Sequence, residues 1–185
     1  MGLIKNLFTS LFLLIILTVI LGIIYPLVMT GIGKLAFPNQ TNGSLIEKDG
    51  IIIGSKLISQ DFTSGKYFHG RPTVSDSSNA PVSKTMLDRI SKNIKASQTY
   101  NLQENNAVPI DLITDSGSTF DPDISPESAY FQVPRISKVT GIAPDKIIAL
   151  IKKNTKERFM GIYGERRVNV LLLNLDLDIF LNENH

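Results

Sequence analysis

LFLLIILTVILGIIYPLVM, residues 11–29, contains 14 Leu, Ile, Phe or Val side chains in 19 positions. At about −0.3 to −0.6 kcal/mol each, these side chains favour insertion into a bilayer by roughly 4 to 8 kcal/mol. The uncharged stretch between Lys5 and Lys34 has 28 residues. As a helix it measures about 42 Å, which exceeds the bilayer core of about 30 Å. The sequence therefore predicts one transmembrane helix over about residues 7–33, kinked at Pro26 and with Tyr25 near the interface.

A cleaved signal peptide is the alternative interpretation of this segment. Signal peptides have an apolar core of about 7–15 residues that ends at a small-x-small site. The apolar core here is longer, and Gly31-Ile32-Gly33 is a poor cleavage site, so we expect an uncleaved anchor. Lys5 precedes the anchor, whereas Lys34 follows it with no further basic residue before Lys48. This asymmetry predicts a single-pass protein of the cell membrane with a cytoplasmic N-terminus and an extracytoplasmic domain.

The remainder of the chain has the composition of a soluble domain. The formal charge of +2 comes from Lys5 and Lys34 alone, because residues 36–185 carry 17 basic and 17 acidic side chains. This balance argues against nucleic acid as a partner. The chain has no Cys, which excludes disulfides, cysteine zinc sites and a thiol nucleophile. We expect an anchor part over residues 1–36 and a soluble domain over 37–185, which opens with a polar linker at 37–44.

Turn and capping residues predict the first elements of the domain. Asp49-Gly50 is a typical turn pair and predicts a hairpin over residues 44–58. Apolar residues at helical spacing predict a helix over residues 83–100, with Ser83 as its N-cap.

The second half of the domain is predicted in the same way. A Ser-Pro-Glu start predicts a helix over 125–141 that is broken near Pro134, and a second helix begins at Pro144. Residues 167–173 are predicted to form a buried strand, and residues 174–179 either extend it or belong to a final helix. Strands near both ends with helices between them indicate a compact α+β domain.

The sequence contains no complete catalytic or phosphate-binding signature. The patterns of P-loops, dinucleotide-binding turns, zinc proteases and serine-hydrolase elbows are all absent. His69 and His185 are the only histidines, which argues against a histidine metal site. Catalysis by His69 would need a nucleophile or base, and the spacing identifies none.

An acidic run in the middle of the domain invites a calcium interpretation. A calcium loop that began at Asp121 would have Pro126 and Gln132 at the positions that require Gly and Glu. We therefore expect a turn in which Asp and Ser side chains bond to their own backbone. The acidic residues concerned are Asp111, Asp115, Asp121 and Asp123.

The stretch YFHGRP, residues 67–72, combines two aromatic rings, a His and an Arg around a Gly. Such a cluster can present a recognition surface or bind an anion. It is also typical of a structural turn, with the aromatic rings packed inward and Arg71 paired to a carboxylate. We favour the structural interpretation.

In combination, these stretches resemble the C subunit of the Kdp potassium-transporting P-type ATPases. The resemblance covers nearly the whole chain, in the order Tyr25-Pro26, GSxLIxQxF at 54–62, YFHGRP at 67–72, VPxDxxTxSGS at 108–118, DPxISP at 121–126, QVxR at 132–135 and RVNVxxLN at 167–174. Departures from the family pattern at Ser59, Thr119-Phe120 and Arg166 affect local turns only. The resemblance marks as motif or partner-contact candidates Tyr67, Phe68, His69, Gly70, Arg71, Pro72, Ser116, Gly117, Ser118, Arg135, Asn169 and Asn174.

The resemblance implies a non-catalytic accessory subunit of a high-affinity, ATP-driven potassium uptake complex. Its partners would be a channel-like potassium-binding subunit, a P-type ATPase subunit, a small single-helix subunit and membrane lipid. Gly22, Gly31 and Gly33 would allow its anchor to approach partner helices closely. The chain has no D-K-T-G-T phosphorylation sequence. No tightly bound cofactor is expected, and ATP would be met only through the complex.

The family is described as a catalytic chaperone that raises the ATP affinity of the ATPase subunit, and this role would carry a nucleotide contact over to Gln132. An extracytoplasmic domain conflicts with that contact, because ATP is cytoplasmic. Such a domain would instead cap the outer mouth of the channel-like subunit. The alternatives from other classes are a membrane-anchored extracytoplasmic enzyme that uses His69 and an Asp, or a ligand-binding module.

Overall fold

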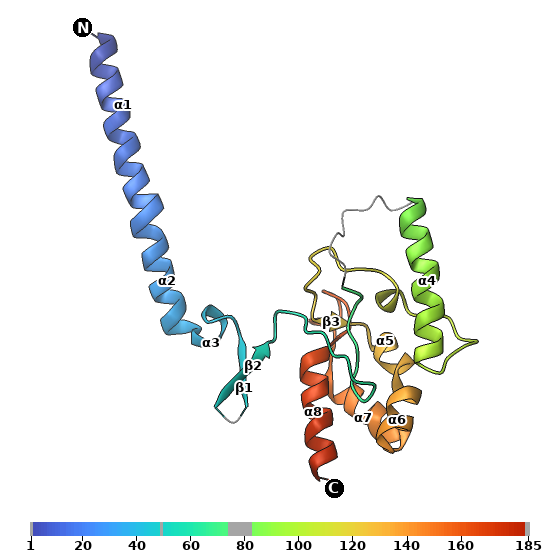
Figure 1. The fold of residues 1–185 in the computed structure, drawn as a ribbon. Helices are drawn as coiled ribbons and strands as arrows, with labels where there is room; N and C mark the ends of the chain where they lie inside the picture. Colours follow the sequence, from blue (N-terminus) through green and yellow to red (C-terminus); the bar gives the residue numbers. More distant parts are fainter. Residues whose placement is uncertain (1, 49, 74–82, 184–185) are drawn as a thin grey trace. The chain divides into compact units, whose positions relative to one another are not determined.

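The computed structural model describes residues 2–48, 50–73 and 83–183. The chain divides into two compact units, Met1–Leu45 and Ile46–His185. The first consists of a long helix that is followed in the sequence by a short helical turn. The second is a mixed domain of short strands and helices (Figure 1). The mixed content of the second unit confirms the α+β prediction.

The first unit is dominated by a continuous helix from Gly2 to Ala36, and no residue along it is buried. It consists of α1 (Gly2–Val19), a π-helical turn η1 (Ile20–Ile24) and α2 (Tyr25–Ala36). Within the described residues it is the one helix that is long and apolar enough to cross a membrane. Pro26 has no N–H group to donate to the preceding turn, and the π-helical irregularity lies directly before it.

The linker that the sequence predicts at residues 37–44 is partly helical. Residues Pro38–Thr41 form the single turn α3, which begins with Pro at a position where its missing N–H costs nothing. The turn has Asn42 as its C-cap, and Gly43 follows with a φ of 84°, the left-handed conformation that favours glycine. A hairpin follows, with strands β1 (Leu45–Lys48) and β2 (Ile51–Ser55), as predicted. Asp49 of its predicted turn lies outside the described residues.

A three-stranded antiparallel sheet lies inside the domain, in the order β3-β5-β4. Its strands are β3 (Asp123–Ile124), β4 (Thr155–Lys156) and β5 (Arg167–Asn169). Val168 of the central strand stands opposite Ile124 on one side and Thr155 on the other. Val168 is fully buried, so the short sheet contributes directly to the core.

The helices begin where capping residues predict. The hydroxyl of Ser83 accepts a hydrogen bond from Met86 at the start of α4 (Lys84–Tyr100), and that of Ser125 accepts one from Ser128 at the start of α5 (Pro126–Phe131). The remaining helical elements are η2 (Ile110–Leu112), α6 (Val133–Thr140), α7 (Pro144–Asn154) and α8 (Val170–Glu183).

The predicted break in the 125–141 helix is confirmed. Gln132 separates α5 from α6, and Pro134 lies in the first turn of α6, where its missing N–H is tolerated. Gly141, with φ of 75°, ends α6 as predicted.

The predicted strand over 167–173 is wrong beyond Asn169. The side chain of Asn169 accepts a hydrogen bond from the backbone N–H of Leu172 and so caps α8. Four apolar residues in a row are compatible with either a buried strand or a buried helix. Burial at Val170, Leu173 and Leu177 follows helical spacing, which decides for the helix. Residues 174–179 accordingly belong to the final helix, one of the two predicted possibilities.

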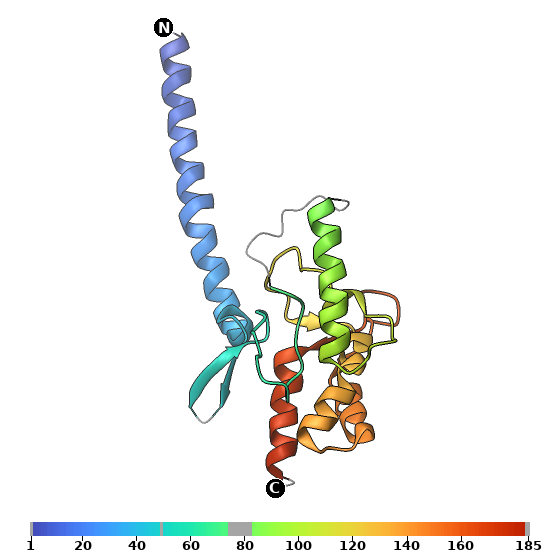
Figure 2. The same ribbon diagram turned by 45° about the vertical axis from the view of Figure 1, so that its right-hand side comes forward.

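The core is built by β3, β5 and the helices of the second half of the chain. Figures 1 and 2 both show α6, α7 and α8 side by side at the end of the domain that carries the C-terminus. Phe68, from an irregular segment, completes this core and is fully buried. The other core members are Ile124, Ala129, Val133, Ile136, Ile147, Ile151, Val168, Val170, Leu173 and Leu177.

Candidate functional site

The YFHGRP stretch, residues 67–72, crosses the domain without regular secondary structure. Its backbone is held by two amide side chains from distant parts of the chain. Asn174 of α8 accepts a hydrogen bond from the Phe68 N–H (2.8 Å) and donates one to the Phe68 carbonyl (2.9 Å). Gln132 does the same for His69, with distances of 2.8 and 3.0 Å. Each amide thus exchanges two hydrogen bonds with one residue, as paired residues do in an antiparallel ladder.

Gln132 uses its whole hydrogen-bonding capacity inside the domain. Its Oε1 accepts from the His69 N–H and from Nη2 of Arg135 (2.8 Å), and its Nε2 donates to the carbonyls of His69 and Ser128 (3.2 Å). A glutamine amide has two donor hydrogens and two acceptor lone pairs, so all four are occupied. The side chain is only 1% exposed. It is therefore a fully satisfied buried amide at the junction of α5 and α6.

Arg135 is a buried cation at the same junction, 3% exposed. Its Nε donates to Oδ1 of Asn101 (2.9 Å), its Nη1 donates to the Gly65 carbonyl, and its guanidinium lies 4.7 Å from the ring centre of Tyr100. Among the described residues no carboxylate pairs with it, so neutral oxygens and a π face compensate the charge. Burial lowers the pKa of Arg135, against a smaller opposing influence from Tyr100.

His69 lies beside this cation. Its ring centre is 5.3 Å from that of Tyr100, and its Nε2 is 3.3 Å from the Ser64 carbonyl oxygen. Burial lowers the pKa of His69, and the positive charge of Arg135 lowers it further. In the part of the chain that the structure describes, no carboxylate contacts the ring. Both influences favour the neutral form of the imidazole.

Arg71 ties the same stretch to the loop 110–121. Its Nη2 donates to Oγ1 of Thr114 and to the carbonyl of Asp115, both at 3.1 Å. Its Nη1 lies 3.9 Å from Asp111 and 3.8 Å from Asp121. These contacts agree with the interpretation of residues 67–72 as a structural turn, in which Arg71 pairs with carboxylates.

Asp111 joins this loop to the start of α5. Its Oδ2 accepts from the Ser125 N–H (2.8 Å) and from the Ser128 hydroxyl (3.1 Å). Burial opposes the ionisation of Asp111, but the hydrogen bonds from Ser125 and Ser128 and the charge of Arg71 outweigh it and lower its pKa. Asp111 therefore acts here as an ionised acceptor.

The other carboxylates of the acidic run are engaged separately. Asp115 pairs with Arg89 of α4 (2.7 Å), Asp123 pairs with Arg167 (2.9 Å), and Asp121 accepts a hydrogen bond from the Asp123 N–H (3.0 Å). The last of these is the predicted Asx turn. The described residues contain no group of three or more His, Cys, Asp or Glu that could hold a metal ion.

The remaining motif residues do not converge on one centre. The Tyr67 hydroxyl donates to the carboxylate of Asp178 (2.9 and 3.0 Å), and Asn169 donates to the Lys56 carbonyl (3.0 Å) and to Asp123 (3.1 Å). Ser116 is buried, whereas Gly117 and Ser118 are exposed. Gly70 and Pro72 border a cavity.

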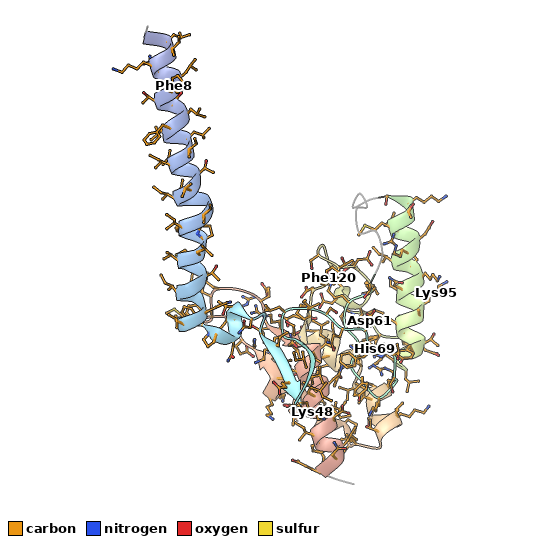
Figure 3. The ribbon with its side chains drawn as sticks, turned by 60° about the vertical axis from the view of Figure 1, so that its left-hand side comes forward. Phe8, Lys48, Asp61, His69, Lys95 and Phe120 are labelled. Carbon is orange, nitrogen blue, oxygen red and sulfur yellow. The ribbon has the colours of Figure 1, made fainter. Side chains whose placement is uncertain are left out.

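This cavity, of about 460 Å³, lies where the YFHGRP stretch faces α4. Figure 3 marks Asp61 and His69 in this region, with Lys95 of α4 pointing away from the domain. Its charged members are Asp61 and Arg71, and its titratable members also include His69 and Tyr100.

Tyr100, Asn101, Ser128 and Asp178 are parts of this framework that the sequence did not single out. Asn101 is the C-cap residue of α4, so the predicted helix end at Tyr100 was the only local signal for it. The contacts of Asp178 with Tyr67 span 111 residues, and no local pattern indicates them.

The comparisons with known proteins agree with one another. A family model described as "KdpC: K+-transporting ATPase, c chain" matches residues 7–179. A protein of Rhodopseudomonas palustris (strain BisB5) is 46% identical, over 94% of this chain and 96% of that protein. One of Bradyrhizobium diazoefficiens is 47% identical over 90% and 92%, and one of Janthinobacterium sp. (strain Marseille) 44% identical over 88% and 92%. All three are named "Potassium-transporting ATPase KdpC subunit". The chain therefore belongs to the KdpC family of K+-transporting ATPase c chains.

Proposed function

We propose that the chain is a non-catalytic accessory subunit of an ATP-driven potassium uptake complex, and that it acts by assembling and stabilising this complex. The proposal rests on one observation: the motif residues make their hydrogen bonds to one another inside the domain. Phe68, His69, Gln132, Arg135 and Asn174 bind one another and form the interior framework of the domain. Residues engaged in internal hydrogen bonds in this way favour a rigid domain that binds partners over a catalytic centre.

The anchor is the second part of the proposal. The apolar helix Gly2–Ala36 holds the chain in the cell membrane, with the N-terminus in the cytoplasm and the domain outside. Its residues have no buried contacts of their own, so lipid and the helices of partner subunits would cover them. A Cβ at Gly22 or Gly31 would meet no atom within 4 Å, which leaves these positions open for a close helix approach.

The occupied amide of Gln132 bears on the nucleotide contact that the resemblance implies. A hydrogen bond to ATP would require Gln132 to release one of its four present partners inside the domain. An unsatisfied buried partner costs about 1–3 kcal/mol. We therefore propose that Gln132 influences the complex through the stability of the domain, and that nucleotide binds only to the ATPase subunit.

Co-purification tests the assembly role. The full chain, tagged and co-expressed with the other subunits of a potassium-transporting ATPase, is expected to retain them in detergent extracts and to be needed for potassium-stimulated ATP hydrolysis. Extracts in which the chain never travels with an ATPase subunit would overturn the proposal.

Kinetics of a Gln132 variant separates the two roles. Gln132→Leu is expected to reduce the amount of assembled complex and to leave the KM for ATP of the remaining complex unchanged. Gln40→Leu, at an exposed glutamine of α3, is the matched control and should change neither quantity. A raised KM for ATP at normal assembly would favour the nucleotide contact instead.

A single introduced cysteine tests the topology, because the chain has none of its own. Lys95→Cys places a thiol on the exposed side of α4. We expect a membrane-impermeant maleimide to label it in intact cells. Labelling only after the membrane is opened would place the domain in the cytoplasm and make direct ATP contact possible.

A further inference from the structure

The helix α4 (Lys84–Tyr100) is attached to the domain differently from α7 and α8. None of its 17 residues is buried, whereas α7 and α8 both contribute to the core. Met86, Ile90 and Ile94 are half-buried, but none of them belongs to the core cluster or to the apolar residues packed against it. In Figure 1 the helix lies at the edge of the domain. An element with few buried apolar contacts opens at a lower free energy than the core does.

Polar contacts join the first part of α4 to one loop of the domain. Arg89 pairs with Asp115 at 2.7 Å, and the side-chain amide of Asn93 donates to the Ile113 carbonyl at 3.1 Å. Both partners belong to the loop 110–121, so these contacts leave the C-terminal end of the helix to a second set of residues.

The C-terminal end of α4 is held by His69 and Arg135. The ring centre of Tyr100 lies 5.3 Å from that of His69 and 4.7 Å from the guanidinium of Arg135. Asn101, the C-cap residue, accepts a hydrogen bond from Nε of Arg135 at 2.9 Å. The backbone of His69 is itself fixed by Gln132. The His69 ring therefore connects the clamped YFHGRP stretch with the end of α4.

The charges around the His69 ring disfavour a proton on it. From α6 it faces the buried cation of Arg135, and from α4 it faces the ring of Tyr100. Arg71 of its own stretch is a second cation on the same cavity. Among the described residues that line this cavity, Asp61 is the one carboxylate, and it makes no ion pair with the ring.

A proton on the ring would add a positive charge next to Arg135 at a place where burial limits solvation. Burial and the charge of Arg135 both lower the pKa of His69 in the folded domain. In water the ring regains its ordinary pKa of about 6.5. Proton binding therefore favours conformations in which the ring has left Tyr100 and Arg135. Because α4 buries no residue of its own, loss of this contact frees its C-terminal end.

We propose that His69 is a pH-sensitive switch for α4, and that a proton on its ring releases the end of this helix from the domain. Release opens the cavity between α4 and residues 67–72, while the core stays closed because α4 contributes no residue to it. On the proposed topology the external pH would set this switch. The release itself involves this chain alone, so its test does not depend on the proposed function.

Hydrogen exchange at low urea concentrations tests the switch on the purified full chain in detergent. The α4 amides are expected to exchange through a local opening that does not depend on urea below the unfolding transition. After correction for the intrinsic exchange rate, their protection should fall by up to about tenfold between pH 7.5 and 5.5, because pH 5.5 is one unit below the ordinary pKa. The amides of α7 and α8 should stay better protected and should depend on urea.

Two results for the unsubstituted chain would overturn the proposal. One is protection of α4 that does not change with pH. The other is protection of α4 with the same size and the same urea dependence as that of α7 and α8, because α4 would then open only when the whole domain unfolds.

Substitution of each histidine assigns the dependence to one residue. His69→Gln cannot take up a proton, so the protection of α4 should be equal at both pH values. His185→Gln, at the only other histidine of the sequence, is the matched control and should keep the full pH dependence. A pH dependence that survives His69→Gln, or one that disappears in His185→Gln, would contradict the proposal.

A variant on the helix side keeps the test decisive if His69→Gln disturbs the fold, which loss of protection in α7 and α8 would reveal. Tyr100 is 43% exposed, so Tyr100→Leu leaves the core intact but removes the ring that His69 contacts. This variant should lower the protection of α4 at pH 7.5 and remove most of its pH dependence. Protection equal to that of the unsubstituted chain at both pH values would overturn the proposal.

Discussion

Two irregular stretches of the domain contain similar residue types but differ in how deeply these residues are buried. Residues 67–72 and residues 157–166 both combine aromatic rings with arginine and glycine. In the first, Phe68 is fully buried and its backbone is clamped by an amide; in the second, Phe159 is 72% exposed. The motif residues at 67–72 thus belong to the interior framework of the domain, whereas large exposed apolar residues lie in a stretch without an obvious motif.

Removal of a ring from each stretch should give the sharpest contrast. Phe68→Ala is expected to lower the free energy of unfolding by about 3–5 kcal/mol, because it leaves a cavity in the core. Urea unfolding of the purified full chain in detergent measures this loss. Phe159→Ala is the matched control, and a comparable loss there would contradict the distinction between the two stretches.

The amide clamp should be the next most sensitive feature. Asn174→Leu keeps the approximate volume but leaves the N–H and carbonyl of Phe68 without their partner, which should cost about 2–3 kcal/mol. The same unfolding measurement checks it. Asn106→Leu, at an exposed asparagine, serves as the control and should change stability little.

A fall in pH should lower the stability of the domain through protonation of His69 in residues 67–72. The pKa of His69 is lower in the folded domain than its ordinary value of about 6.5. The unfolded chain therefore binds a proton more readily, so this contribution to stability is complete above about pH 6.5 and is lost as the pH falls below that value. The effect should be smaller than that of Asn174→Leu, because solvent partly screens the half-buried ring.

Thermal melting between pH 7.5 and 5 measures this dependence. His69→Gln should flatten the profile relative to the unsubstituted chain, and identical profiles would rule out a role for this histidine. Residues 157–166 contain no histidine, so their own contribution to stability should not share this dependence.

The smallest change is expected at the exposed apolar residues 159–163. Ile162→Ser alters a side chain that is 74% exposed, so the free energy of unfolding should shift by no more than about 0.5 kcal/mol. Urea unfolding checks this, and a loss above about 1 kcal/mol would show that this side chain supports the fold.

Features that depend on neighbouring residues could be predicted from the sequence. Ser83 and Ser125 each cap a helix that begins immediately after them, and Gly141 ends one by adopting a left-handed conformation. The strand predicted for residues 170–173 is wrong, because a buried strand and a buried helix have the same composition and residues 170–173 begin α8.

The hydrogen bonds that build the candidate site join residues far apart in the sequence, so no local pattern could predict them. Gln132 bonds to a residue 63 positions away, and Asn174 to one 106 positions away. The sequence could mark both through the family resemblance, but their pairing with consecutive residues of one stretch required the fold. The sequence did not indicate that the residues FMGIY at 159–163 are exposed, because apolar residues close to a predicted strand resemble core residues.

The clamp on Phe68 also sets an order of events during synthesis. Its partner Asn174 lies 106 positions later in the sequence, in α8. Contacts of such long range raise the contact order and slow folding. A ribosome must therefore have synthesised α8 before the interior of the domain can close around Phe68. A premature stop upstream of residue 174 would thus yield a domain that cannot close its interior and is exposed to proteolysis.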